Sequence, residues 1–167
     1  MEKDKLKELI AEAKRIEEVS IRSAKSQFEA ADKWKQINLW LGIPTALLSG
    51  IAGISILSNW SYLLGGSLAL LVASLTALMT FLNPDRKSNS HLNSGNNYLA
   101  LRNKSRLFRN ITIKTKLNFE ELVEELTELA DMRDSLNKSS PQFSRKDFEK
   151  AKKGISEGEA DYQVDSD

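Results

Sequence analysis

Side chains with catalytic or metal-binding chemistry are scarce in this sequence. There is one histidine, His91, and no cysteine, so a histidine pair for a metal, a thiolate zinc site and a cysteine nucleophile are all excluded. The acidic pairs at 120–121 and 124–125 fall at helical spacing beside basic neighbours, as on a solvated or ion-paired helix face. Glycine-rich phosphate-binding loops are absent. These residue types predict a protein that is not an enzyme and needs no metal or cofactor.

The main feature of the chain is a long stretch without charge. Residues 36–84 contain no Asp, Glu, Lys, Arg or His, although 28% of the chain is charged. Within this stretch we predict two apolar helices, at 37–57 and 62–82. Each rises roughly 31 Å, which matches a hydrocarbon core of about 30 Å. The residues between them, 58–61, are enough only for a turn. The prediction is an all-α integral membrane protein with a two-helix transmembrane hairpin.

The alternative is a hairpin buried inside a soluble bundle. Against it, the second apolar stretch has no polar stripe, and a chain of 167 residues cannot cover two such helices on every side. Orientation follows from the basic residues. Lys33 and Lys35 precede the first helix, Arg86 and Lys87 follow the second, and the turn carries none. By the positive-inside rule, we expect both termini on the cytoplasmic side of a membrane that the chain crosses twice.

Small residues predict how these helices pack. At spacings of three or four they line one face of each helix, where backbones can approach closely. They are Gly42, Ala46, Gly50, Gly53, Gly66, Ala69, Ala73 and Ala77. They serve packing within one hairpin, packing between copies, or both. Pro44 removes a backbone hydrogen bond, so we predict a hinge there, with a kink or a break of the helix.

Hydroxyl groups are the candidates for lining a pore. The two apolar helices contain no ionisable residue, which excludes a proton relay within them. Taken singly, each hydroxyl bonds back to its own helix. A ring of them from several copies would line a narrow wet path, and the candidates are Ser49, Ser67, Ser74, Thr76 and Thr80. One hairpin cannot enclose a pore, so conduction requires a homo-oligomer.

Helical patterns on both sides of the hairpin predict a small cytoplasmic bundle. Residues 1–36 form an amphipathic helix, residues 83–155 a helical region, and residues 156–167 an acidic, flexible tail. The apolar stripe of the first helix consists of Leu6, Leu9, Ala13, Ile16, Ser20, Ala24, Ala31 and Trp34. We expect one later helix to begin at Asn118, capped with Glu121, and to end at 139–141. A shorter one is expected at 144–153, capped by Ser144 with Asp147.

Basic residues follow the second apolar helix. Between positions 86 and 116 there is no acidic residue, and anionic headgroups attract each lysine or arginine by about 1 kcal/mol. The membrane-proximal candidates are Arg86, Lys87, Arg102, Lys104, Arg106 and Arg109. The chain is nearly neutral, so no nucleic acid is expected as a partner. Direct binding of a nucleotide by this stretch stays open. His91 is expected to bond a backbone group or a headgroup, with pH sensing as the alternative.

Several short motifs follow one another in a characteristic order. They are Leu41-Gly42-Ile43-Pro44, Asn83-Pro84, His91, Asn97-Tyr98-Leu99 with Leu101-Arg102, Ala151-Lys152-Lys153-Gly154-Ile155, Glu157-Gly158 and Tyr162. Together with the long charged first helix, they resemble the SLATT family of bacterial two-helix membrane modules that are associated with nucleotide second-messenger conflict systems. The resemblance covers almost the whole chain.

The resemblance implies a membrane effector of antiviral defence that assembles into pores and depolarises the infected cell. The sensor in such systems is often a nucleotidyltransferase, a reverse transcriptase or a nucleotide-binding domain. We expect no room for one in this chain, so a separate sensor or second-messenger-producing protein is the expected partner, beside the lipid bilayer and further copies. The alternative function is a non-conducting membrane anchor or scaffold that recruits cytoplasmic partners.

Overall fold

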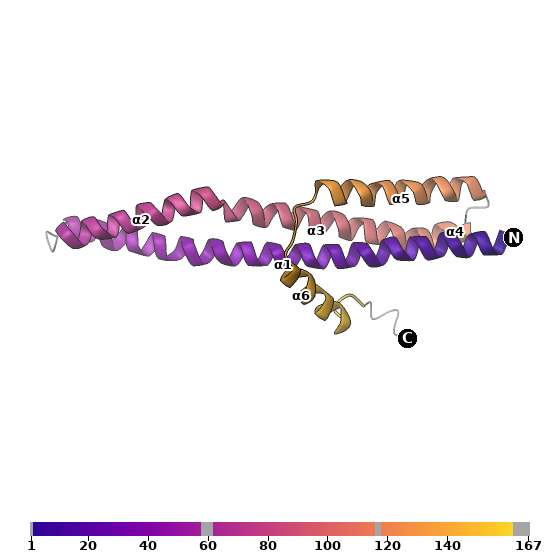
Figure 1. Ribbon diagram of the computed structural model, residues 1–167, viewed down its shortest axis with the longest axis horizontal. Coiled ribbons are helices and arrows are strands. Elements are labelled where there is room, and N and C mark those ends of the chain that lie inside the picture. Colours follow the sequence, from indigo (N-terminus) through magenta and orange to yellow (C-terminus); the bar gives the residue numbers. More distant parts are fainter. Residues whose placement is uncertain (1, 58–61, 116–117, 162–167) are drawn as a thin grey trace. The chain divides into compact units, whose positions relative to one another are not determined.

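The fold is built from helices alone in the part of the chain that the computed structural model describes, which is residues 2–57, 62–115 and 118–161. The predicted turn at 58–61 and the last residues of the predicted tail lie outside that part. The helices are α1 (Glu2–Leu57), α2 (Tyr62–Leu82), α3 (Pro84–Leu107), a π-helical turn (Phe108–Thr112), α4 (Ile113–Thr115), α5 (Phe119–Ser139) and α6 (Arg145–Ser156) (Figure 1). The predicted all-α class is confirmed.

The chain forms two compact parts. Residues 31–89 form the hairpin part, and residues 1–30 with 90–167 form the bundle. Helices α1 and α3 each contribute residues to both parts, because the division falls within them.

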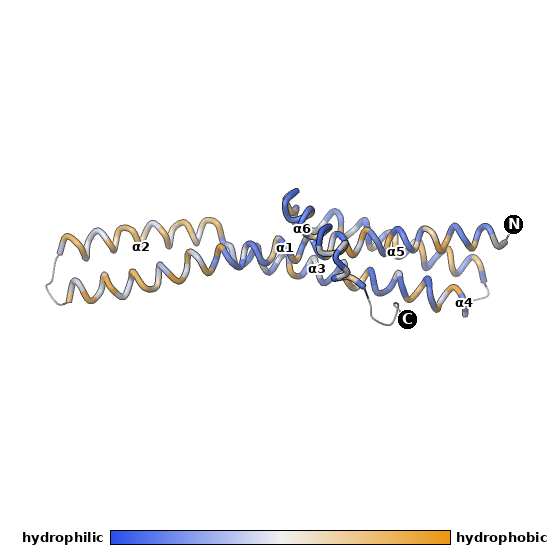
Figure 2. The backbone as a smooth tube through the Cα atoms, turned by 90° about the horizontal axis from the view of Figure 1, so that it is seen from below, coloured by the Kyte–Doolittle hydropathy of each residue, from blue (hydrophilic) through white to orange (hydrophobic). Residues whose placement is uncertain are grey.

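The hairpin part contains two helices that are long and apolar enough to cross a bilayer. Helix α1 ends at Leu57, and α2 has the bounds predicted for the second span. Their most apolar 18-residue windows have mean hydropathies of 1.6 and 1.9, and only 6% of each window is buried. In Figure 2, apolar colours dominate α2 and the length of α1 beside it. Core helices of soluble proteins are mostly buried, so these exposed apolar surfaces fit a membrane hairpin.

Of the kink or break predicted at Pro44, the break is excluded and the kink stays a prediction. Helix α1 continues through Pro44 without interruption. The neighbouring Thr45 hydroxyl donates to the Leu41 carbonyl at 2.6 Å, within the turn that the proline weakens. The carbonyl that loses its donor to Pro44 is that of Trp40, so the Thr45 hydroxyl bonds the next carbonyl and does not replace the missing bond. Whether Pro44 acts as a hinge stays a prediction.

Asn83 separates α2 from α3. Its φ of 44° lies in the left-handed region, which asparagine tolerates better than most residues. Its N–H donates to the Met79 carbonyl at 2.9 Å, and its side-chain oxygen accepts from the Arg86 N–H at 3.4 Å. Pro84 then takes the first helical position, where its missing donor costs nothing. Asn83-Pro84 therefore ends one helix and starts the next.

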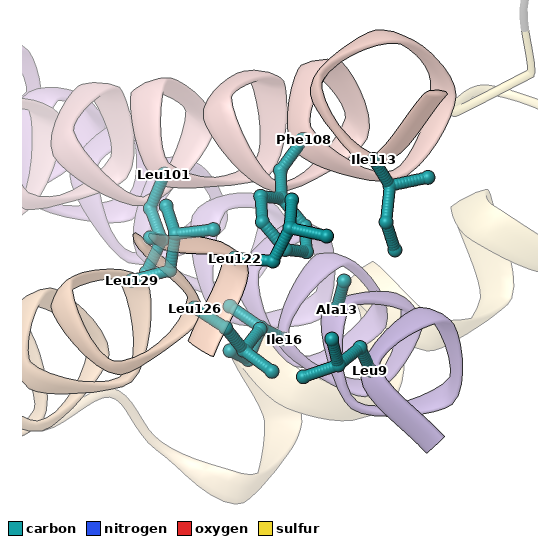
Figure 3. Packing of buried hydrophobic residues seen from close by; sticks show 9 residues of the cluster. All are labelled: Leu9, Ala13, Ile16, Leu101, Phe108, Ile113, Leu122, Leu126 and Leu129. Carbon is teal, nitrogen blue, oxygen red and sulfur yellow. The ribbon is translucent and has the colours of Figure 1, made fainter. Parts of the chain in front are cut away.

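The core of the bundle is shared by α1, α3, the segment after it, and α5. Figure 3 shows its buried side chains pointing toward one another; they are Leu9, Ala13, Ile16, Leu101, Phe108, Ile113, Leu122, Leu126 and Leu129. The predicted stripe of α1 is confirmed at Leu9, Ala13 and Ile16, and it continues through Ser20 and Ala24, both fully buried. The bundle is thus held by an ordinary helix–helix core.

Helix ends in the bundle follow their predicted caps, with one difference. Asn118 caps α5 by accepting from the Glu120 N–H, whereas its contact with Glu121 joins the two side chains at 3.4 Å. Helix α6 carries the predicted capping box of Ser144 and Asp147, and it extends to Ser156, beyond the predicted end.

Gly95 marks a close approach of α3 to α1 within the bundle. A Cβ atom at this position would lie 2.5 Å from the ring of Phe28. The glycine therefore lets the two helices pack around that ring, a role that the sequence analysis did not assign.

Candidate functional site

The buried residues of the two apolar helices are small. Ala52 and Ser55 of α1 and Gly65 of α2 are buried in the hairpin part. Near the other end, a Cβ atom on Gly42 would lie 3.5 Å from the methyl carbon of Met79 in α2. Among the four glycines of the predicted packing set, only Gly42 would place a Cβ atom within 4 Å of the other helix.

The other predicted packing residues are exposed in the single chain. They are Ala46, Gly50, Gly53, Gly66, Ala69, Ala73 and Ala77. Cβ atoms added at Gly50, Gly53 or Gly66 would meet nothing within 4 Å. The hairpin closes on a different set of small residues, so the predicted set remains open for contacts outside the single hairpin.

These exposed small residues share one side of the hairpin. Successive residues of a helix are turned by about 100°. When α1 is viewed along its axis from the N-terminus, its exposed small residues therefore lie clockwise of buried Ala52 and Ser55. In α2 the small residues also lie clockwise of buried Gly65, viewed from the N-terminus of α2. Because the two helices are antiparallel, these two offsets point to the same side. We call this the small side.

The opposite, bulky side carries large apolar side chains. They are Trp40, Leu47, Ile51, Ile54, Leu71, Leu78 and Phe81, with exposed fractions between 44% and 88%. By the same helical angles, the small side also carries the exposed residues Leu39, Tyr62 and Leu70. This side is therefore rich in glycine and alanine but also carries large side chains, whereas large side chains dominate the opposite side. Large, flexible apolar side chains suit contact with lipid tails, whereas small residues let another helix approach.

The candidate pore-lining hydroxyls are divided between these two sides. Ser49, Thr76 and Thr80 lie on the small side, whereas Ser67 and Ser74 lie on the bulky side. Four of the five donate to a backbone carbonyl of their own helix, as is expected of a single hydroxyl in lipid. These bonds run from Ser49 to the Thr45 carbonyl, from Ser67 to Leu64, from Ser74 to Leu70 and from Thr80 to Thr76. The five cannot all face one path.

The six membrane-proximal basic residues differ in their contacts. Arg86 and Lys87 are exposed, and the Lys87 ammonium lies 4.2 Å from the ring centroid of Trp34. Arg109 pairs with Glu17 at 3.1 Å, and Arg102 donates to the Ala160 carbonyl at 2.7 Å. Lys104 donates weakly to the Met132 sulfur, and Arg106 is half-buried. Arg102 and Arg109 thus stabilise the bundle from within.

His91 is buried in the bundle and bonds a side chain. Its Nδ1 lies 2.6 Å from Oε1 of Gln27, whose Nε2 donates to the Pro141 carbonyl at 2.9 Å. A carboxamide oxygen only accepts, so Nδ1 of His91 carries the proton in this arrangement. These contacts join α3, α1 and the segment before α6. The expected contact of His91 with a backbone group or a headgroup stays a prediction. The role of Gln27 could not be predicted because nothing in the neighbouring sequence indicates which distant residue a single polar side chain in a helix will bond.

Tyr98 supports the same region of the bundle. Its hydroxyl donates to Oδ1 of Asn137 at 2.8 Å. Burial raises the pKa of the Tyr98 phenol, and a bond with Ser140 opposes this in part. The phenol therefore stays neutral at physiological pH and remains a donor. In the described residues, no group of three or more His, Cys, Asp or Glu is placed to hold a metal ion.

Comparison with known families agrees with this arrangement of two apolar helices and a helical bundle. The family model described as SMODS and SLOG-associating 2TM effector domain family 4 matches residues 16–167. No curated protein and no solved structure matches the chain. The match covers both apolar helices and nearly the whole bundle. The chain is therefore a member of the SMODS and SLOG-associating 2TM effector domain family, the SLATT family, and a two-span membrane protein.

Proposed function

We propose that this chain is a pore-forming effector that acts as a homo-oligomer and depolarises the bacterial inner membrane when a partner triggers it. The observation that carries the proposal is the small side of the hairpin. Glycine and alanine are exposed there with three hydroxyls, Ser49, Thr76 and Thr80, while the bulky side suits lipid. Packing of several hairpins through this side brings these three hydroxyls around a common axis.

The orientation of the proposed pore follows from its basic residues. Lys33 and Lys35 before the first span, with Arg86 and Lys87 after the second, support a cytoplasmic position for both ends of the hairpin. The bundle then lies in the cytoplasm, where it is accessible to a sensor protein or to a diffusible second messenger. The family description, which names an effector associated with SMODS and SLOG domains, supports such a division of labour. Catalysis, a cofactor and nucleic-acid binding have no part in this proposal.

The direct test measures membrane potential in cells. The complete system, meaning this gene with its neighbouring genes, is introduced into bacteria, and a potential-sensitive dye is followed after phage infection. We expect the potential to collapse before the cells lyse, and to persist when this gene alone is deleted. A potential that stays intact in infected cells with the complete system contradicts the proposal.

A swap of both apolar helices separates a pore from an anchor. When 37–57 and 62–82 are replaced with unrelated apolar helices of equal length, a pore loses its activity. An anchor that only recruits cytoplasmic partners keeps it. Retained protection against infection after the swap therefore favours the anchor over the pore.

A further inference from the structure

The segment that follows α6 bonds two other helices of the bundle. Gly158 adopts a φ of +88°, which turns the chain back after the helix. Oε2 of Glu159 then lies 2.7 Å from Nζ of Lys25 in α1. The next residue, Ala160, accepts through its carbonyl from Nη2 of Arg102 in α3 at 2.7 Å. Two consecutive residues thus connect α1 with α3, in a region that the sequence predicted to be flexible.

Further contacts from the same part of the chain reach α1. The Pro141 carbonyl accepts from Gln27, which also bonds His91 of α3. Lys150 of α6 is ion-paired with Glu29. In Figure 1 the connection from α5 to α6 passes across α1, in agreement with these contacts. We call residues 141–161 the strap.

The strap is attached mainly by polar contacts. The buried residues of α6 are Asp147, Ala151 and Gly154, and the large side chains of the bundle core come from other helices. Phe148 stacks on Phe143 of the same segment with a centroid distance of 6.4 Å, and it remains 38% exposed. Segments with few buried apolar contacts open at lower free energy than the core. The strap can therefore detach while the remaining helices stay folded.

The two helices that the strap connects are those that continue toward the membrane. Helix α1 is uninterrupted from the bundle to Leu57, and α3 starts directly after α2. We propose that the strap holds α1 and α3 together and keeps the assembled hairpins closed, and that its release opens them. This inference rests on the proposed pore function and adds its regulation. The exposed Lys25–Glu159 pair makes the closed state dependent on charge and ionic strength.

Charge reversal at this pair tests the inference in the full-length chain. Lys25→Glu and Glu159→Lys each replace an attraction with a repulsion, so each should raise the resting ion leak of uninfected cells several-fold. The double variant restores the attraction and should return the leak to the wild-type level. Lys14→Glu and Glu128→Lys make the same charge changes at exposed positions outside the strap, and should leak like the wild type.

Release itself is measured without relying on conduction. The chain has no cysteine, and Ala151 of the strap is buried. Ala151→Cys therefore provides a single thiol whose rate of maleimide labelling reports how often the strap detaches. Adding Lys25→Glu should raise that rate, and adding Glu159→Lys as well should reverse the increase. An unchanged labelling rate overturns the inference.

The two readouts distinguish failure of the strap from failure of the pore. If infected wild-type cells depolarise but the Lys25→Glu variant does not leak despite faster labelling, the strap does not close the pore and the inference is overturned. If even infected wild-type cells keep their potential, the pore function fails and the closing role fails with it. A leak that the double variant does not suppress also overturns the inference, because the pair would not be its cause.

Discussion

Ala73→Leu is expected to reduce assembly and infection-induced depolarisation at least about tenfold, which corresponds to about 1.4 kcal/mol. Ala73 is exposed on the small side of α2. A leucine there keeps the helix intact, because leucine is a good helix former, but holds a neighbouring helix away. Assembly is measured by cross-linking in membranes, and depolarisation with the potential-sensitive dye.

Ser74→Leu is the matched control for this prediction. Ser74 is the next residue and is also exposed, but it lies on the bulky side. Its hydroxyl donates to the carbonyl of Leu70 in the same helix. The same side chain added there should meet lipid and leave assembly unchanged. If Ser74→Leu abolishes depolarisation and Ala73→Leu does not, the bulky side faces the pore and the assignment of the two sides is wrong.

The second large effect is expected at the core of the bundle. Phe108 is 1% exposed and packs among residues from α1 and α5 (Figure 3). Phe108→Ala removes most of that side chain and leaves a cavity, so it should lower the free energy of unfolding of the bundle by about 3–5 kcal/mol. The measurement is thermal unfolding of the full-length protein in detergent, followed by circular dichroism.

Leu107→Ala is the control in this case. Leu107 precedes Phe108 but is 54% exposed, so the same truncation removes few contacts. We expect its melting temperature to stay within a few degrees of the wild type. Equal destabilisation by the two substitutions would mean that the bundle does not pack as in Figure 3.

The apolar helices were predictable because lipid imposes strict requirements on sequence. A spanning helix needs about 20 residues without charge, and the bounds of α2 follow from that requirement and from Asn83-Pro84. The apolar stripe of α1 was predictable for a similar reason. Helix faces in contact with water carry charged residues, and the face that packs against other helices is apolar. The cap at Ser144 could be predicted because capping depends on neighbours in sequence.

The face on which each apolar helix packs could not be predicted. Both helices are apolar all round, so no polar stripe marks the exposed direction. Small residues occur on more than one face, and the hairpin uses Gly65 where the sequence analysis selected the adjacent Gly66. A shift of one residue turns a helix face by about 100°, which is enough to exchange inside for outside.

Contacts between residues far apart in sequence were also missed. Lys25 and Glu159 are 134 residues apart, and neither has a local signal for the other. Arg102 was assigned to the lipid surface because it belongs to a basic run, yet it bonds a backbone carbonyl inside the bundle. Composition predicts how a run of charges behaves on average, and only the fold shows which member is engaged.

The account depends most on the claim that several hairpins meet through their small sides. Its most direct test is the mass of the complex that is extracted from membranes in lipid nanodiscs, measured particle by particle for the wild type and for Ala73→Leu. We predict particles that contain several copies of the wild-type chain, and mainly single copies of the variant. Wild-type particles with one copy each, at the same protein-to-lipid ratio, would contradict the account.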